Sequence, residues 1–235
     1  MTGMPSALDA VGAPRIAVID YGAGNLVSIE QALTQVGAVV TVARDAEALR
    51  AVDAVVVPGV GAAGPAMHRL ERRGLVAPLR AWIAAGRPYL GICLGLQLLF
   101  EGSDEDGAVT LGVLAGRSVR LEDAPTLPHI GWNQVVRRSH HPLFDGIDDG
   151  ADFYFVHSFA GRPATGLDEE VVVATTDHGP PFVSAVARGA LLGVQFHPER
   201  SAADGLRLLA NFVDLVRSRP DAAAGPDWPF RAVVA

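Results

Sequence analysis

Short, nearly continuous apolar runs recur in the first hundred residues, and most of them lead into a glycine-containing turn and a helical pattern. The runs are Arg15–Asp20, Ala38–Ala43, Ala54–Val57 and Tyr89–Ile92. Such runs are typical of strands covered on both faces, as in parallel sheets. Helices are predicted over Leu26–Gln35, Met67–Leu70, Ala77–Ala85 and Leu94–Phe100. The alternation predicts an α/β fold with a mostly parallel central sheet flanked by helices.

The second half of the chain changes character, because short strands follow one another with few helices between them. These strands are predicted at Arg117–Leu121, Phe153–His157, Val171–Thr175, Phe182–Ala187 and Leu191–Phe196. We expect additional antiparallel strands here, with a hairpin across Arg188-Gly189, and a closing helix over Ala203–Val216. The organisation predicted is a loose leader at residues 1–14, a single domain at 15–217 and a tail at 218–235.

Composition excludes several classes of function. The chain has 235 residues, a formal net charge of −7 and one cysteine. It has no basic patch, so nucleic-acid binding is disfavoured. It has no secretory signal and no apolar run of the roughly 20 residues that a membrane helix needs. A lone cysteine cannot form an intrachain disulfide. We therefore expect a cytoplasmic protein that binds neither membrane nor nucleic acid.

The only cysteine, Cys93, lies in the sequence Gly-Ile-Cys-Leu-Gly, where a predicted strand becomes a helix. This is the pattern of a nucleophile elbow, in which a sharp turn lifts the nucleophile out of the sheet. Flanking glycines let the backbone pass closely, and the helix N-terminus favours a thiolate. The N–H of Leu94 is then placed to stabilise an oxyanion. The alternative is that Cys93 is a small buried apolar residue, as most free cysteines are.

A thiol nucleophile needs a base, and among seven histidines His197 is the best candidate. It follows a predicted strand directly, and Pro198 favours an extended backbone at His197. Residues two apart in an extended segment point the same way, so Glu199 is expected to accept the ring N–H and fix its tautomer. The pair His140-His141 lacks a surrounding ligand cluster, and no metal site is predicted.

The sequence Pro-Gly-Val-Gly follows another predicted strand. Its two glycines, Gly59 and Gly61, lie on either side of Val60 and allow unusual backbone angles, which can direct peptide N–H groups of this loop at an anion. The alternative, an ordinary tight loop, is the better interpretation of this stretch taken alone.

Taken together, GICLGLQ and QFHPE resemble the triad-type class I glutamine amidotransferases. The resemblance implies a flavodoxin-like sheet with additions and no metal or organic cofactor. It implies that Cys93 attacks the side-chain amide of L-glutamine, that His197 moves the proton to departing ammonia, and that Glu199 orients His197. Gln97 matches a residue that helps to hold the substrate, and the Pro-Gly-Val-Gly loop matches the family's oxyanion strand.

Further motifs resemble the glutamine amidotransferase subunits of imidazole glycerol phosphate synthases. They are DYGAGN, PGVGAAGPAM, CLGLQLLFEGSDE, PHIGWN and FYFVHSF, and the resemblance spans residues 15–216. It implies a heterodimer with a (β/α)₈ cyclase, to which ammonia from glutamine passes in L-histidine biosynthesis. The implied products are imidazole glycerol phosphate and aminoimidazole carboxamide ribotide.

The resemblance also implies roles for two further groups of residues. Those expected to line the glutamine site are Tyr154, His157 and Ser158. Those expected at the cyclase interface are Asn25, Trp132 and Asn133. Departures from the family pattern are Arg200 where lysine is usual, Phe159 where tyrosine is common, and His178 where tyrosine is frequent.

Three alternatives stay open at this point: a subunit of a different amidotransferase, a non-catalytic relative, and a thiol hydrolase of γ-glutamyl compounds that acts without a synthase. We also expect the isolated chain to hydrolyse glutamine poorly, because release of ammonia into solvent would waste the substrate.

Overall fold

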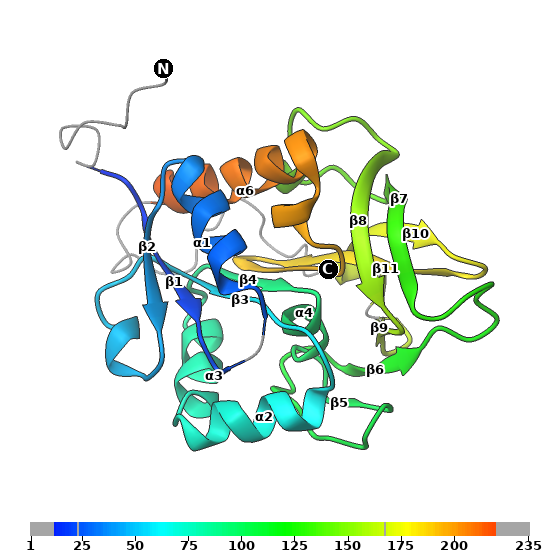
Figure 1. The fold of residues 1–235 in the computed structure, drawn as a ribbon, viewed down its shortest axis with the longest axis horizontal. Helices are drawn as coiled ribbons and strands as arrows, with labels where there is room; N and C mark the ends of the chain where they lie inside the picture. Colours follow the sequence, from blue (N-terminus) through cyan, green and yellow to red (C-terminus); the bar gives the residue numbers. More distant parts are fainter. Residues whose placement is uncertain (1–11, 23, 167, 220–235) are drawn as a thin grey trace.

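The larger sheet has parallel strands on one side and antiparallel strands on the other (Figure 1). The computed structural model describes residues 12–22, 24–166 and 168–219. Within them the sheet has nine strands in the order β2-β1-β3-β4-β12-β11-β10-β7-β8. The parallel strands are β1 (Arg15–Ile19), β2 (Val39–Ala43), β3 (Ala54–Val57), β4 (Tyr89–Ile92) and β12 (Leu191–Val194). The order β2-β1-β3-β4-β12 is that of a flavodoxin-like sheet.

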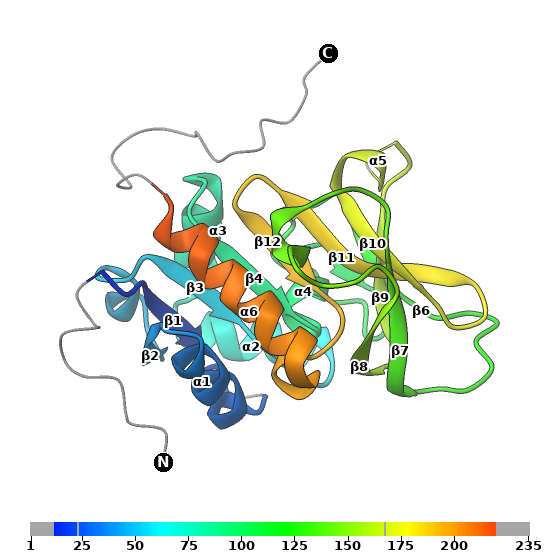
Figure 2. The ribbon, with the colours of Figure 1, turned by 90° about the horizontal axis from the view of Figure 1, so that it is seen from above.

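The helices cover both faces of the parallel strands (Figures 1 and 2). On one face lie α1 (Leu26–Gln35) and α6 (Ala202–Arg217), and on the other lie α2 (Ala63–Arg72) and α3 (Val76–Ala84). Alternate residues of each strand enter opposite cores, so that Ile16 and Val18 pack on the α1–α6 side whereas Ala17 and Ile19 pack on the other. This two-sided burial explains the continuous apolar runs in the sequence.

Four antiparallel strands extend the sheet beyond β12. They are β11 (Pro181–Arg188), β10 (Val172–Asp177), β7 (His129–Arg137) and β8 (Ala151–His157). The predicted hairpin is confirmed, because Arg188 pairs with Leu191 across a turn in which Gly189 has a φ of +59°. A smaller sheet joins β5 (Gly102–Ser103), β6 (Gly116–Arg120) and β9 (Phe159–Pro163). The short elements are η1 (Glu47–Leu49), η2 (Pro142–Phe144), η3 (Pro198–Arg200), α4 (Leu94–Gln97) and α5 (Asp168–Val171).

Several predicted bounds differ from the structure. The helix predicted over Leu94–Phe100 ends at Gln97, because the carbonyl oxygens of residues 98–100 accept hydrogen bonds from residues 111–113 instead of continuing the helix. Helix α2 is longer than predicted, and the closing strand ends at Val194 rather than Phe196. Strand β7, which contains Trp132, is not among the predicted strands.

The leader and tail predictions fall mostly outside the described residues. Residues 1–11 and 220–235 are not described, and the division into leader, domain and tail stays a prediction. Within the described part, the carbonyl of Pro14 already accepts a hydrogen bond from the N–H of Val39.

Candidate active site

Cys93 sits on a strained turn between β4 and α4. Its φ of 53° and ψ of −106° are unusual for a residue with a side chain. A Cβ at Gly95 would lie 1.8 Å from the carbonyl oxygen of Val57, and one at Gly91 would lie 2.5 Å from the carbonyl oxygen of Gly95. Only glycine fits at both positions, so the two flanking glycines are what allow this turn to form.

His197 reaches Cys93 because the strands that precede them are neighbours. Val194 of β12 is in register with Ile92 of β4, and the N–H of Cys93 donates to the Val194 carbonyl at 2.7 Å. The N–H of His197 donates to the carbonyl of Tyr154 in β8 at 2.8 Å. The Ser201 hydroxyl donates to the His197 carbonyl at 2.7 Å and accepts the Tyr154 N–H at 3.0 Å. The histidine, which follows β12, is thereby tied twice to Tyr154 of β8.

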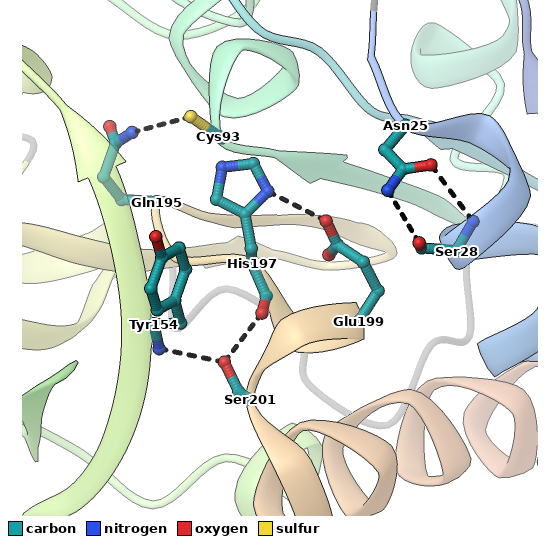
Figure 3. A network of polar contacts seen from close by, with 8 residues as sticks. All are labelled: Asn25, Ser28, Cys93, Tyr154, Gln195, His197, Glu199 and Ser201. Carbon is teal, nitrogen blue, oxygen red and sulfur yellow. Dashed lines mark hydrogen bonds and ion pairs between the residues drawn. The ribbon is translucent and has the colours of Figure 1, made fainter. Parts of the chain in front are cut away.

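The His197 ring lies between the Cys93 sulfur and the Glu199 carboxylate (Figure 3). Its Nδ1 donates to Glu199 Oε1 at 2.9 Å, and both side chains are buried, with 6% and 4% exposed. Within the described residues, His197 Nε2 and Glu199 Oε2 are buried without a hydrogen-bond partner. The contact between His197 and Glu199 was expected, but its geometry was not: Glu199 lies in the 3₁₀ turn η3, whereas only His197 is extended.

The environment of His197 favours its charged form. Burial is the largest single influence and lowers the pKa of His197. The proximity and charge of Cys93, followed by the hydrogen bond and charge of Glu199, outweigh burial and raise the pKa to about 10. An imidazolium between a thiolate and a carboxylate is the charge arrangement that nucleophilic catalysis by cysteine requires.

The predicted oxyanion donor is engaged within the protein. The N–H of Leu94 donates to the carbonyl oxygen of Gly59 at 3.4 Å. The Pro58 carbonyl accepts a buried hydrogen bond of 2.9 Å from the Tyr21 hydroxyl. One contact therefore holds the Pro-Gly-Val-Gly loop against the elbow, and a second holds it to Tyr21.

The rest of this loop does not point a peptide N–H at the site. A trans peptide directs its C=O and N–H in opposite directions, so the Val60 N–H faces away from Leu94 while the Gly59 carbonyl faces towards it. Val60 is 48% exposed, and Gly61 has a φ of +90°, which favours glycine.

The side chain of Gln97, expected to help hold the substrate, forms two hydrogen bonds within the protein. Gln97 Nε2 donates to the Phe159 carbonyl at 2.7 Å and to Gln195 Oε1 at 3.2 Å.

Tyr154 and His157, both expected at the glutamine site, lie on opposite faces of β8 because they are three residues apart. His157 faces the core, and Ser158 lies partly buried between β8 and β9.

The three residues expected at the cyclase interface lie in different environments. Trp132 is 54% exposed, and Asn133, its neighbour in β7, faces the opposite side, where its Nδ2 donates to the Asp177 carbonyl at 2.8 Å. Asn25 caps α1, where its Oδ1 accepts from the Ser28 N–H at 3.4 Å and its Nδ2 donates to the Ser28 hydroxyl at 2.7 Å (Figure 3).

Arg200, which departs from the family pattern, lies over the ring of Tyr154. Its guanidinium carbon is 4.0 Å from the ring centroid. The Tyr154 ring in turn contacts Trp132 edge-to-face, with centroids 6.1 Å apart. A planar guanidinium suits this stacking better than the compact ammonium of lysine.

Sequence reasoning assigned no role to three buried residues of this region. Gln195 donates from Nε2 to the Cys93 sulfur at 3.5 Å, although QFHPE had drawn attention only to His197 and Glu199. Tyr21 lies within DYGAGN and His129 lies within PHIGWN, but neither residue had a predicted role. The available signal was their place in these motifs, since a polar residue within an apolar strand indicates a buried hydrogen bond.

The described residues contain neither a cluster of metal ligands nor a helix that could span a membrane. No group of three or more His, Cys, Asp or Glu side chains in the described part of the chain is arranged to hold a metal ion. No helix among the described residues is long and apolar enough to cross a membrane.

A flavodoxin-like sheet with a Cys–His–Glu set at its strand ends defines the class of protein. The family model of class-I glutamine amidotransferases matches residues 17–215. A solved structure titled as a glutamine amidotransferase shares the fold, with a TM-score of 0.68, 21% identity and coverage of 86% of this chain and 98% of that one. A structure of PurLQS from Thermotoga maritima also has a TM-score of 0.68, at 17% identity, with coverage of 86% and 98%.

Two curated relatives narrow the assignment. Imidazole glycerol phosphate synthase subunit HisH of Moorella thermoacetica is 49% identical over 203 residues, covering 86% of this chain and 95% of the relative. The HisH subunit of Symbiobacterium thermophilum is 47% identical over 211 residues, covering 88% and 98%. The chain belongs to the class-I glutamine amidotransferases and, within them, to the HisH glutaminase subunits of imidazole glycerol phosphate synthase.

Proposed function

We propose that Cys93, His197 and Glu199 carry out the glutaminase reaction of this subunit. The Cys93 thiolate attacks the side-chain amide carbon of L-glutamine, and the C–N bond breaks as the His197 imidazolium gives its Nε2 proton to the departing ammonia. Water then attacks the glutamyl thioester while neutral His197 takes the proton of the water. Glutamate is released, and the Cys93 thiolate and the His197 imidazolium are restored. The observation that carries this proposal is the His197 ring, held by Glu199 on one side and facing the Cys93 sulfur on the other.

The tetrahedral intermediate places negative charge on the former amide oxygen, which the Leu94 N–H is positioned to stabilise. That donor is occupied by the Gly59 carbonyl. The described arrangement is therefore a resting one, and the Gly59–Val60 peptide has to turn before both N–H groups can serve the oxyanion. This supports the expectation that the isolated subunit hydrolyses glutamine slowly.

The partner we propose is a (β/α)₈ cyclase, with which the chain forms a heterodimer. Exposed apolar side chains on β7 support a docking surface there: Ile130, Trp132 and Val136 are 59%, 54% and 47% exposed and alternate along one face. Ammonia passes from Cys93 to the cyclase, which forms imidazole glycerol phosphate and aminoimidazole carboxamide ribotide. We place the enzyme in the cytoplasm, where reducing conditions keep a catalytic thiol free.

Ammonia release from glutamine tests the proposal in three mixtures: the subunit alone, with the cognate cyclase, and with the cyclase plus its ribotide ligand. We expect slow hydrolysis in the first mixture and strong stimulation in the third. Cys93→Ala serves as the blank in each mixture. Fast hydrolysis at the same rate with and without the loaded cyclase would contradict the coupling and favour a free thiol hydrolase. Absence of hydrolysis in all three mixtures would overturn the catalytic assignment.

A further inference from the structure

Gln195 is a fully buried polar residue that the proposed mechanism leaves unused. It follows β12 and is 0% exposed. Its Nε2 lies 3.5 Å from the Cys93 sulfur and donates a hydrogen bond to it (Figure 3). An amide N–H next to sulfur stabilises a thiolate, whereas the amide oxygen in the same place would repel it. The orientation of this one amide group therefore matters for the reactivity of Cys93.

The orientation of Gln195 is set by a backbone carbonyl two steps away. The carbonyl of Phe159 can only accept, so the nitrogen of Gln97 must face it, at 2.7 Å. The same Gln97 Nε2 lies 3.2 Å from the Gln195 amide and requires an acceptor there. Gln195 therefore presents Oε1 to Gln97, which leaves its Nε2 for the sulfur of Cys93.

The Phe159 carbonyl is in turn held by a pair of buried histidines. His157 Nδ1 donates to it at 2.9 Å, so His157 Nε2 is an acceptor and receives His129 Nδ1–H at 3.1 Å. His129 Nε2 then accepts from Asn133 Nδ2 at 3.2 Å. Burial lowers the pKa of both histidines, to about 3 for His157 and about 4 for His129, which keeps them in the neutral form that this order requires.

We propose that Gln195 is the positioning residue of Cys93, and that the chain from the Phe159 carbonyl through Gln97 keeps its N–H, rather than its oxygen, towards the sulfur. This inference rests on the proposed function, because it explains how the thiolate of that site is held. Gln195 makes no proton transfer. Its role is to fix the sulfur in place and to stabilise its charge before glutamine arrives.

The test follows the reaction of Cys93 with iodoacetamide, which needs no glutamine and reports on a single thiol because the chain has one cysteine. Gln195→Met keeps the length and burial of the side chain but removes the donor. We expect iodoacetamide to alkylate Cys93 about tenfold more slowly in this variant at neutral pH, and the pH profile of the alkylation rate to be moved to higher pH. The kcat for glutamine should fall by a similar factor, with a smaller change in KM. The other titratable groups that act on Cys93, His197 and Tyr21, are unchanged in this variant.

A second variant tests orientation and leaves Gln195 in place. In Gln97→Glu the group beside Gln195 becomes an acceptor, so the Gln195 amide should turn and present its oxygen to the sulfur. We expect alkylation slower than in Gln195→Met. Gln134→Met, the same change at an exposed glutamine of β7, is the control and should alkylate like the wild type.

Alkylation at the wild-type rate in folded Gln195→Met, or in folded Gln97→Glu, would overturn the proposal. Folding is checked by thermal unfolding of each variant. A wild-type chain that alkylates rapidly but releases no ammonia from glutamine would instead refute the proposed function and leave the positioning role standing.

Discussion

The backbone N–H of Leu94 donates to the carbonyl oxygen of Gly59, which places a protein acceptor where a reacting amide oxygen has to bind. The residue after the nucleophile supplies an oxyanion donor in enzymes with this elbow. The hydrogen bond between Leu94 and Gly59 is 3.4 Å long, so it is a weak contact that a substrate or a loop movement can replace. We expect the basal rate of glutamine hydrolysis to depend on the balance between this arrangement of the loop and one in which the Leu94 N–H is free.

Tyr21→Phe is expected to shift that balance. The Tyr21 hydroxyl holds the Pro58 carbonyl at 2.9 Å in a buried contact, and phenylalanine keeps the ring but loses this bond. We expect the free energy of unfolding to fall by about 1–2 kcal/mol. Basal ammonia release without the cyclase should rise, because the loop is less firmly held in its resting arrangement. Steady-state assays with and without loaded cyclase measure this, and an unchanged basal rate would show that Tyr21 does not restrain the loop.

Cys93→Ala is expected to abolish use of glutamine by at least about 10³-fold, since the attacking atom is lost. The elbow itself should survive, because alanine adds no atom to the crowded turn. Complex formation with the cyclase and synthesis from external ammonium should therefore persist, and both are measured with the same purified variant. Loss of the ammonium-dependent reaction would reveal a structural role for the thiol.

Glu199→Gln keeps an acceptor for His197 Nδ1 but removes the negative charge. Since the Glu199 hydrogen bond and charge raise the pKa of His197, the variant should have a lower pKa at this histidine and a less stable imidazolium. We expect kcat to fall roughly a hundredfold, less than in Cys93→Ala. Glu122→Gln, an exposed carboxylate on another surface, is the matched control. Equal rates in the two variants would argue against the orienting role of Glu199.

Acid should weaken the fold through the buried pair His129 and His157. His197 acts in the opposite direction above about pH 6.5, because its raised pKa of about 10 makes the folded state bind more protons there. Burial lowers the pKa of His129 to about 4 and of His157 to about 3, whereas in the unfolded chain both titrate near 6.5. Between these values the unfolded state binds more protons, so the free energy of unfolding falls as the pH drops from about 6.5 towards 4. We expect a loss of roughly 1–2 kcal/mol per histidine between pH 7.5 and pH 5.

Urea unfolding at both pH values measures this loss. His129→Phe should reduce the dependence on pH, and His68→Gln, at an exposed position, should not. Asp20 and Asp53 have lowered pKa values, so their contribution is lost only below about pH 4, outside this window. The same dependence on pH in His129→Phe as in the wild type would contradict the prediction.

Trp132→Ala tests the proposed docking surface on β7. A half-exposed aromatic ring supported by Tyr154 is the kind of side chain that dominates binding energy when a partner covers it. We expect the dissociation constant for the cyclase to rise by about 30-fold or more, measured by titration calorimetry. Val39→Ala on β2, at the opposite edge of the sheet, serves as the control and should bind as the wild type does.

The sequence predicts the parallel half of the sheet well because both faces of these strands are buried. The bounds of β3, β4 and α1 are those predicted from the apolar runs and the helical pattern. Strand β7 was missed because Gly131 and the polar residues around it look like a loop. Its pairing with β8, from His129 opposite His157 to Val135 opposite Ala151, depends on a partner strand that local sequence does not reveal.

The candidate site likewise has a part that local sequence predicts and a part that depends on residues distant in the chain. The strand–glycine–cysteine–glycine pattern is local, and so it predicted the turn at Cys93. The contact of Gln195 with Cys93 joins residues 102 positions apart and was not predicted. Glu199 was placed beside His197 for an incomplete reason, because the chain turns into a 3₁₀ helix that the sequence does not distinguish from continued extension.

The position of β12 has a consequence for synthesis of the protein. It is the last strand among the described residues, yet it lies in the middle of the sheet, between β4 and β11. A ribosome delivers the chain from its N-terminus. A nascent polypeptide therefore exposes an open edge on β4, and carries Cys93 without its histidine, until nearly the whole domain has been made. We expect products of interrupted translation that end before β12 to contain the thiol but to lack glutaminase activity.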